Sequence, residues 1–202
     1  DNERLCNVFR KMVRFTAFLS FPVMFGLAII SQEFIILAIG SKWAESVFLL
    51  QILCISGAFL PLHGTFQNLI ISKGRSDLYL WGNIGLLLSS IVLIVALGKL
   101  GIVIMIVAYS ILNIGWVAVW QYYAHKLIGL KFMDTLKDIF PFFISALAVM
   151  SISYFIASFV DSMVLRLIIK MILSVVIYFT VMKLAKVKML DECMNYIFHR
   201  NK

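Results

Sequence analysis

Residues 78–98 read LYLWGNIGLLLSSIVLIVALG and contain no charged side chain. A helix needs about 20 mainly apolar residues to cross the hydrocarbon core of a membrane. Five other stretches of the chain have the same apolar character. The sequence therefore predicts six membrane spans, at residues 15–32, 46–72, 78–98, 100–124, 139–160 and 163–182.

The composition of the whole chain agrees with this prediction. Of the 202 residues, 62% are hydrophobic and 14% are charged, and the mean hydropathy is +1.00. Soluble domains are about 45–50% apolar and about 25% charged, and disordered chains are less apolar still. The composition therefore excludes both a soluble domain and a disordered chain. Strands are disfavoured because the apolar runs do not alternate, whereas a helix satisfies its own backbone in lipid. We therefore expect an all-α polytopic membrane bundle.

The net charge of +8 is explained by where the cations lie. If the six spans alternate, 14 of the 18 Lys and Arg residues fall on one side: Arg4, Arg10, Lys11, Arg14, Lys73, Arg75, Lys126, Lys131, Lys137, Lys183, Lys186, Lys188, Arg200 and Lys202. Positively charged loops mark the cytoplasmic face of a membrane protein. Both termini are predicted to be cytoplasmic, and the charge requires no nucleic acid partner.

The chain is predicted to have three parts. Residues 15–185 form the six-helix bundle, between an amphipathic lead-in (1–14) and a basic amphipathic tail (186–202). Each flank either lies on the anionic inner leaflet, or extends a membrane helix or packs on another domain. Five aromatic residues lie at the cytoplasmic ends of the third and fourth spans, and they either form the interfacial belt or are simply packed inside the protein: Tyr79, Trp81, Trp120, Tyr122 and Tyr123.

Polar residues inside a membrane are the candidates for function. The second span has the densest set, because His63, Gln67 and Asn68 follow Pro61, which is expected to kink the helix. This polar face is either a solute pathway or a set of hydrogen bonds between helices. In the sixth span, Arg166 and Lys170 share one helix face and either contact an anionic lipid phosphate or extend to the membrane surface.

Nothing in the sequence indicates an enzyme. Asp134 and Asp138 read as ordinary surface residues of a lysine-rich loop, and no catalytic triad or phosphate-binding loop is present. Cys6, Cys54 and Cys193 are too scattered for a disulfide framework or a metal site. We expect no catalytic residue, no metal and no cofactor.

Two short motifs carry a resemblance to a known family. Gly40 and Trp43 lie in GSKWAES before the second span, and Gly74 and Asp77 lie in KGRSD after it. Their order resembles the C-terminal half of the polysaccharide-biosynthesis flippases, the lipid-linked oligosaccharide translocases of the multidrug/oligosaccharidyl-lipid/polysaccharide superfamily. In physical terms, Gly74 permits a tight turn and Asp77 can cap the following helix, while Lys73 and Arg75 either fix the topology or contact a lipid diphosphate.

The resemblance implies a function and partners. It implies a bacterial inner-membrane exporter that moves undecaprenyl-diphosphate-linked oligosaccharide or exopolysaccharide units by alternating access. The six spans would be the last six of a longer protein, and its N-terminal helices would be partners of this chain, as would membrane lipids. A polysaccharide polymerase or glycosyltransferases are further expected partners. His63, Gln67, Asn68, Lys73, Arg75, Arg166 and Lys170 are the candidate substrate-pathway residues.

Three alternative functions remain open. One is a cation-coupled drug antiporter of the same superfamily, which is disfavoured because no Asp or Glu lies inside a predicted span. Another is a non-transporting scaffold for a polysaccharide synthase. The third is a membrane glycosyltransferase, which would require a long outer loop with acidic residues upstream of this sequence.

Overall fold

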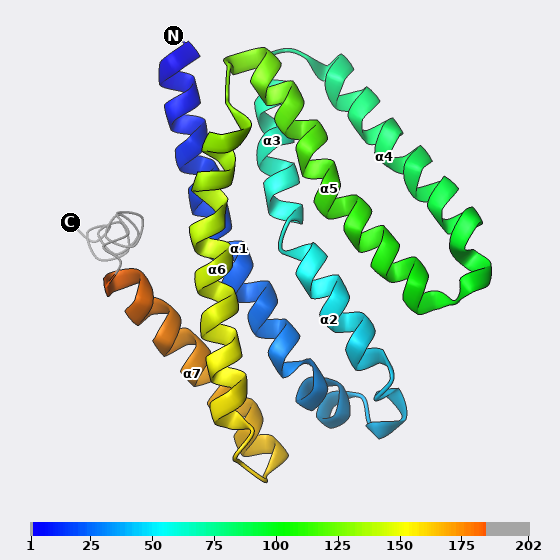
Figure 1. Cartoon of the computed structure of the whole chain (residues 1–202), viewed down its shortest axis with the longest axis vertical. Coiled ribbons are helices and arrows are strands. Elements are labelled where there is room, and N and C mark those ends of the chain that lie inside the picture. Colours follow the sequence, from blue (N-terminus) through cyan, green and yellow to red (C-terminus); the bar gives the residue numbers. More distant parts are fainter. Residues whose placement is uncertain (1, 185–202) are drawn as a thin grey trace.

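The computed structural model describes residues 2–184, and these residues form helices joined by short connections (Figure 1). The elements are α1 (Asn2–Ala38), α2 (Ser46–Gly57), α3 (Leu60–Ser72), α4 (Ser76–Leu97), α5 (Ile102–Ile128), α6 (Phe132–Ala157) and α7 (Met163–Leu184). Two single turns of 3₁₀ helix, Ser41–Trp43 and Gly98–Leu100, lie between them. Six segments of the described chain are long and apolar enough to cross a membrane, with α2 and α3 together forming one of them. The all-α prediction is confirmed.

The first helix is longer than the predicted first span. α1 has 37 residues, which is about 55 Å of helix against a hydrocarbon core of about 30 Å. The predicted lead-in (1–14) is the beginning of this continuous helix, and its cytoplasmic location stays a prediction. The predicted tail (186–202) lies outside the described residues.

Helix α1 forms the centre of one half of the bundle. It packs against α6, α7, α2 and α3, whereas α5 packs against α2, α3 and α4. α4 lies at the outer edge and contacts α5 and α3 (Figure 1). The N-terminal end of α1 and the α3–α4 and α5–α6 connections lie at one end of the bundle, as the alternating topology predicts. Which end faces the cytoplasm stays a prediction.

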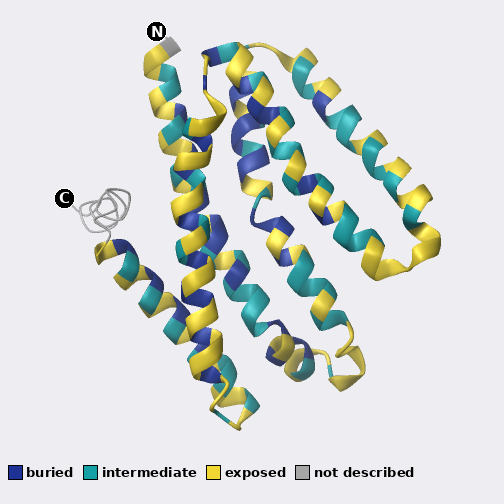
Figure 2. Ribbon diagram, in the orientation of Figure 1, coloured by how far each residue is buried: buried dark blue, intermediate teal, exposed yellow. Residues whose placement is uncertain are grey.

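The core is aromatic and sits mainly around α1. Phe21 is fully buried, and its ring meets those of Phe59 and Phe143 edge-on at centroid distances of 5.2 and 5.5 Å. Aromatic pairs prefer this edge-to-face geometry. Figure 2 shows buried residues on α3 and along α1 and α6, whereas α4 is exposed or intermediate over almost all of its length. Gly82 is the one buried residue of α4.

One residue of the predicted aromatic belt is placed elsewhere by the structure. Trp120 has no exposed surface, whereas Trp81 is 65% exposed and Tyr122 is 62% exposed. For Trp120 the structure favours the packing alternative, because its indole fills the space left by Gly82. A Cβ atom at Gly82 would lie 2.4 Å from the Trp120 ring. The glycine at position 82 of α4 thus makes room for the indole of Trp120 on α5.

Candidate functional site: polar groups inside the helical bundle

The second span is interrupted where the sequence predicts a distortion. α2 ends at Gly57 and α3 begins at Leu60, with Pro61 in its first turn. Proline suits a first turn because it lacks an N–H group, which has no helical partner at that position. The distortion is a break between two helices rather than a kink in a continuous one. Bonds from the N–H groups of Ala58 and Phe59 to the carbonyls of Cys54 and Ser56 satisfy the backbone there.

The polar side chains after the break bond to neighbouring helices. His63 is buried, and its Nε2 atom lies 3.0 Å from the Asn113 carbonyl oxygen on α5, which makes Nε2 the donor. Gln67 donates from Nε2 to Asn83 Oδ1 on α4 at 3.3 Å. Asn68 is exposed. This geometry favours the hydrogen-bonding alternative for His63 and Gln67, and the substrate-pathway role of all three stays a prediction.

The turn between α3 and α4 depends on the left-handed backbone conformation of its glycine. Gly74 has a φ of 69°, a left-handed backbone conformation that residues with a side chain adopt only with strain. Arg75 donates from Nε and Nη2 to the two carboxylate oxygens of Asp77 at 2.9 and 2.8 Å, and these bonds raise the pKa of Arg75 above its ordinary value. Arg75 precedes α4 and Asp77 lies in its first turn, so Asp77 is not at the N-cap position itself. Its carboxylate nevertheless accepts from backbone N–H groups of that turn, those of Leu78 and Asp77, as the capping prediction expects. Lys73 is partly exposed beside this pair.

The other motif forms the tight connection after α1. Gly40 has a φ of 117° and accepts a bond from the Trp43 N–H at 3.1 Å. Trp43 is 57% exposed. Because this connection lies at the opposite end from Gly74, the two motifs bracket the second span.

The most strongly buried charges form an ion pair that the sequence does not predict. Lys170 on α7 and Glu33 on α1 have side chains 2% and 1% exposed, and Lys170 Nζ lies 2.7 Å from Glu33 Oε1. Lys170 also donates to the Ile29 carbonyl at 2.8 Å and lies 4.8 Å from the centre of the Tyr154 ring on α6. Buried charges need such partners because water is absent. The pair therefore joins α1, α6 and α7.

The pair places an acidic residue inside a membrane helix, contrary to the expectation from the sequence. The first span is predicted to end at Gln32, one residue before Glu33. In the structure Glu33 lies within α1, because the helix continues to Ala38. The other candidate cation of α7, Arg166, donates to the Val160 carbonyl at 3.0 and 2.8 Å. Lys170 does not extend to the membrane surface, and the substrate-pathway role of both cations stays a prediction.

A second ionic cluster lies toward the other end of α1. Asp138 on α6 is buried, contrary to the expectation of an ordinary surface residue. It accepts two hydrogen bonds from Arg10, at 2.7 and 3.2 Å, which explains how a carboxylate is tolerated there. Among the described residues, no group of His, Cys, Asp and Glu side chains could hold a metal ion.

Six hydrophobic spans with short connections define a multi-pass membrane protein. The resemblance to polysaccharide-biosynthesis proteins is confirmed by comparison with known families, since residues 1–48 match the family model described as "Polysaccharide biosynthesis protein". The match lies in α1 and the start of α2, and it includes the Gly40 and Trp43 motif. A membrane protein related to polysaccharide biosynthesis is therefore the class of protein that this chain resembles.

Three curated proteins show the same similarity. The chain is 36% identical over 78 residues to an "uncharacterized membrane protein in cps region" of Klebsiella pneumoniae, covering 39% of this chain and 16% of the relative. It is 33% identical over 88 residues to the teichuronic acid biosynthesis protein TuaB of Bacillus subtilis, covering 44% and 18%. It is 31% identical over 78 residues to the lipopolysaccharide biosynthesis protein WzxC of Escherichia coli, covering 39% and 16%.

The matched region is thus a small part of each relative, less than a fifth of its length. No solved structure matches the chain.

Proposed function

We propose that this chain is part of a flippase that moves lipid-linked oligosaccharide, carried on undecaprenyl diphosphate, across the bacterial inner membrane. The observation that carries the proposal is the combination of relatives and architecture. The relatives are named for the synthesis of polysaccharides, teichuronic acid or lipopolysaccharide, while the described residues are almost entirely membrane helix. If this part of the protein contributes to such synthesis, it acts within the membrane.

The helix break in the second span supports a transport mechanism. Alternating access requires membrane helices that change their relative angle, and discontinuous helices are common in transporters. The break at Ala58 and Phe59 is the point at which α2 and α3 would change their relative angle, and both helices pack against α1 and α5. The remaining helices of a longer protein, membrane lipids, and a polymerase or glycosyltransferases are its proposed partners.

A cation-coupled antiporter is the second candidate, and Glu33 is the observation that favours it. A buried membrane carboxylate is the kind of group that binds a transported proton or cation. In this structure Lys170 neutralises Glu33 through a 2.7 Å contact, so ion coupling would require this pair to separate. That requirement makes the antiporter the weaker of the two.

Deletion of the full gene in its native bacterium tests the proposal. Lipid-linked repeat units should accumulate on the cytoplasmic leaflet, and the wild-type gene supplied in trans should restore their delivery to the outer leaflet. Normal delivery in the deletion strain would refute the flippase. A changed drug sensitivity with normal glycan delivery would support the antiporter instead.

A further inference from the structure

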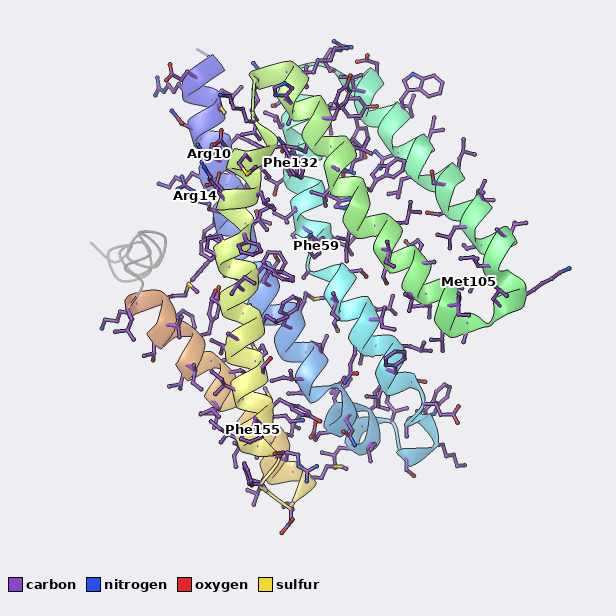
Figure 3. All side chains as sticks on the ribbon, viewed as in Figure 1. Arg10, Arg14, Phe59, Met105, Phe132 and Phe155 are labelled. Carbon is purple, nitrogen blue, oxygen red and sulfur yellow. The ribbon has the colours of Figure 1, made fainter. Side chains whose placement is uncertain are left out.

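Two arginine side chains of α1 contact the buried carboxylate of Asp138. Arg10 binds both of its oxygens, and Arg14 places Nε 3.7 Å from Asp138 Oδ1. Figure 3 shows the two arginines one turn apart on α1. Lys137 precedes Asp138 on α6 and is exposed, and Asp134 lies near enough to act on Arg10. Three cations and two carboxylates leave this region with one excess positive charge.

Arg14 is the cation whose hydrogen bonding is incomplete. A separation of 3.7 Å is an ionic contact but is too long for a hydrogen bond. The Nε atom of Arg14 is buried and has no hydrogen-bond partner. Buried donors are nearly always satisfied, and the Arg14 side chain as a whole is 44% exposed, so its guanidinium can reach an acceptor outside the protein.

A cavity of about 330 Å³ lies beside Arg14, between α1, α6 and α7. Its polar lining consists of Arg14, Lys137, Asp138 and Ser145, and its apolar lining includes Phe142, Val181 and Met182. The cavity therefore presents two cations, the carboxylate that Arg10 binds and a hydroxyl group, together with hydrocarbon walls. This combination suits an amphiphile better than a free ion.

The depth of the cavity also fits an amphiphile. The first turns of α6 carry Asp134, Lys137 and Asp138, and the uncharged run of this helix begins only at Ile139. The cavity therefore lies beside the end of a membrane span, where lipid headgroups are found. This end of the bundle is also the one that the charge distribution predicts to face the anionic cytoplasmic leaflet.

We propose that this cavity binds the headgroup of an anionic membrane phospholipid. Arg14 and Lys137 contact the phosphate, and the guanidinium fork of Arg14 matches phosphate oxygens. Phe142, Val181 and Met182 contact the glycerol and the first carbons of the acyl chains. Arg10 neutralises Asp138, so its carboxylate does not repel the lipid. The bound lipid holds α7 against α1 and α6.

Lipid binding to the purified full-length protein tests this proposal. Phosphatidylglycerol or phosphatidylcholine is titrated in neutral detergent, and bound lipid is counted by native mass spectrometry. The variants Arg14→Gln and Lys137→Gln are compared with Lys99→Gln, which removes an exposed cation at the opposite end of the bundle. Lys137→Gln keeps the test valid if Arg14→Gln fails to fold, because Lys137 is exposed.

We expect phosphatidylglycerol to bind more tightly than phosphatidylcholine. Arg14→Gln and Lys137→Gln should each weaken its binding about fivefold, the usual effect of one cation near an anionic membrane surface, whereas Lys99→Gln should leave it unchanged. Equal binding of the two lipids would overturn the proposal, as would equal effects of all three variants. Complete displacement of phosphatidylglycerol by millimolar inorganic phosphate would show a small-anion site and would also contradict it.

Discussion

Among individual residues, the buried charges are tied to partners on other helices. Lys170 bonds to Glu33 and to a backbone carbonyl, and Arg10 bonds to Asp138. A single charged residue at the bilayer centre costs about 2.5–3.5 kcal/mol on insertion scales. Pairing offsets this cost, and it also determines which faces of α1, α6 and α7 meet. Glu33 Oε2 is buried without a hydrogen-bond partner, so the Lys170 pair leaves half of that carboxylate unsatisfied.

Replacing Lys170 with Met should strongly destabilise the protein. The change leaves the Glu33 carboxylate buried without its cation, which costs about 3–5 kcal/mol when one partner of a buried pair is removed. The double variant Lys170→Met/Glu33→Gln should recover most of the loss because neither charge remains. Thermal unfolding of the full-length protein in detergent measures both effects.

Arg75→Met is the matched control for that experiment. It breaks the Arg75–Asp77 pair, whose side chains are 46% and 54% exposed. Exposed pairs contribute about 0–1 kcal/mol, so the unfolding temperature should change little. A loss as large as that of Lys170→Met, or a double variant no more stable than Lys170→Met alone, would contradict the role given to the buried pair.

Among the helices, α4 depends on one close contact for its position. It contacts α5 and α3, and Gly82 is its one buried residue. Trp120 of α5 occupies the space over Gly82, while Gly85 makes a similar but looser contact with Trp116. Small residues at helix interfaces in membranes let neighbouring helices approach closely in this way.

Gly82→Ala should therefore weaken the α4–α5 contact. The new Cβ atom would lie within 2.5 Å of two ring carbons of Trp120, and overpacking of this kind costs about 1–3 kcal/mol. Gly115→Ala is the matched control on α5, because a Cβ atom there has no neighbour within 4 Å. It should be neutral or stabilising, since alanine favours helix over glycine. Equal unfolding temperatures for the two variants would argue against the contact.

The six membrane spans could be predicted from the sequence, whereas the full length of α1, the division of the second span into α2 and α3, and the contacts between helices could not. Length and hydropathy determine a membrane span locally, so residues 78–98 correspond closely to α4. The Lys170–Glu33 pair joins residues 137 positions apart, and packing alone brings them together. One signal was present, because Glu33 stands between two apolar stretches and a single helix through both would bury it.

The burial of Trp120 is another contact between helices that could not be predicted from the sequence. Its position near the end of an apolar span is typical of an interfacial aromatic residue, yet Gly82 on another helix provides a site for it. The polar residues His63 and Gln67 are similar, since their partners on α5 and α4 decide between a solute pathway and hydrogen bonding. These pairings depend on tertiary structure.

For the whole molecule, the charge distribution predicts the orientation in the membrane. In variants without the native cysteines, Lys73→Cys and Lys131→Cys should react with a membrane-impermeant thiol reagent from the cytoplasmic side only. Lys42→Cys and Lys99→Cys should react from the outer side only. All four positions lie in or beside connections between spans. Labelling of all four from one side would contradict the six-span topology, and labelling with the two sides exchanged would contradict the predicted orientation.

The central claim is that the protein containing this chain moves lipid-linked oligosaccharide across the membrane. The most direct measurement is translocation in liposomes that contain only the purified full-length protein and a lipid-linked oligosaccharide, with lipid in the accessible leaflet detected by an impermeant glycosidase. The account predicts that inner-leaflet substrate becomes accessible over time, and that protein-free liposomes show no such change. A protected inner-leaflet fraction that stays constant with folded protein present would contradict it.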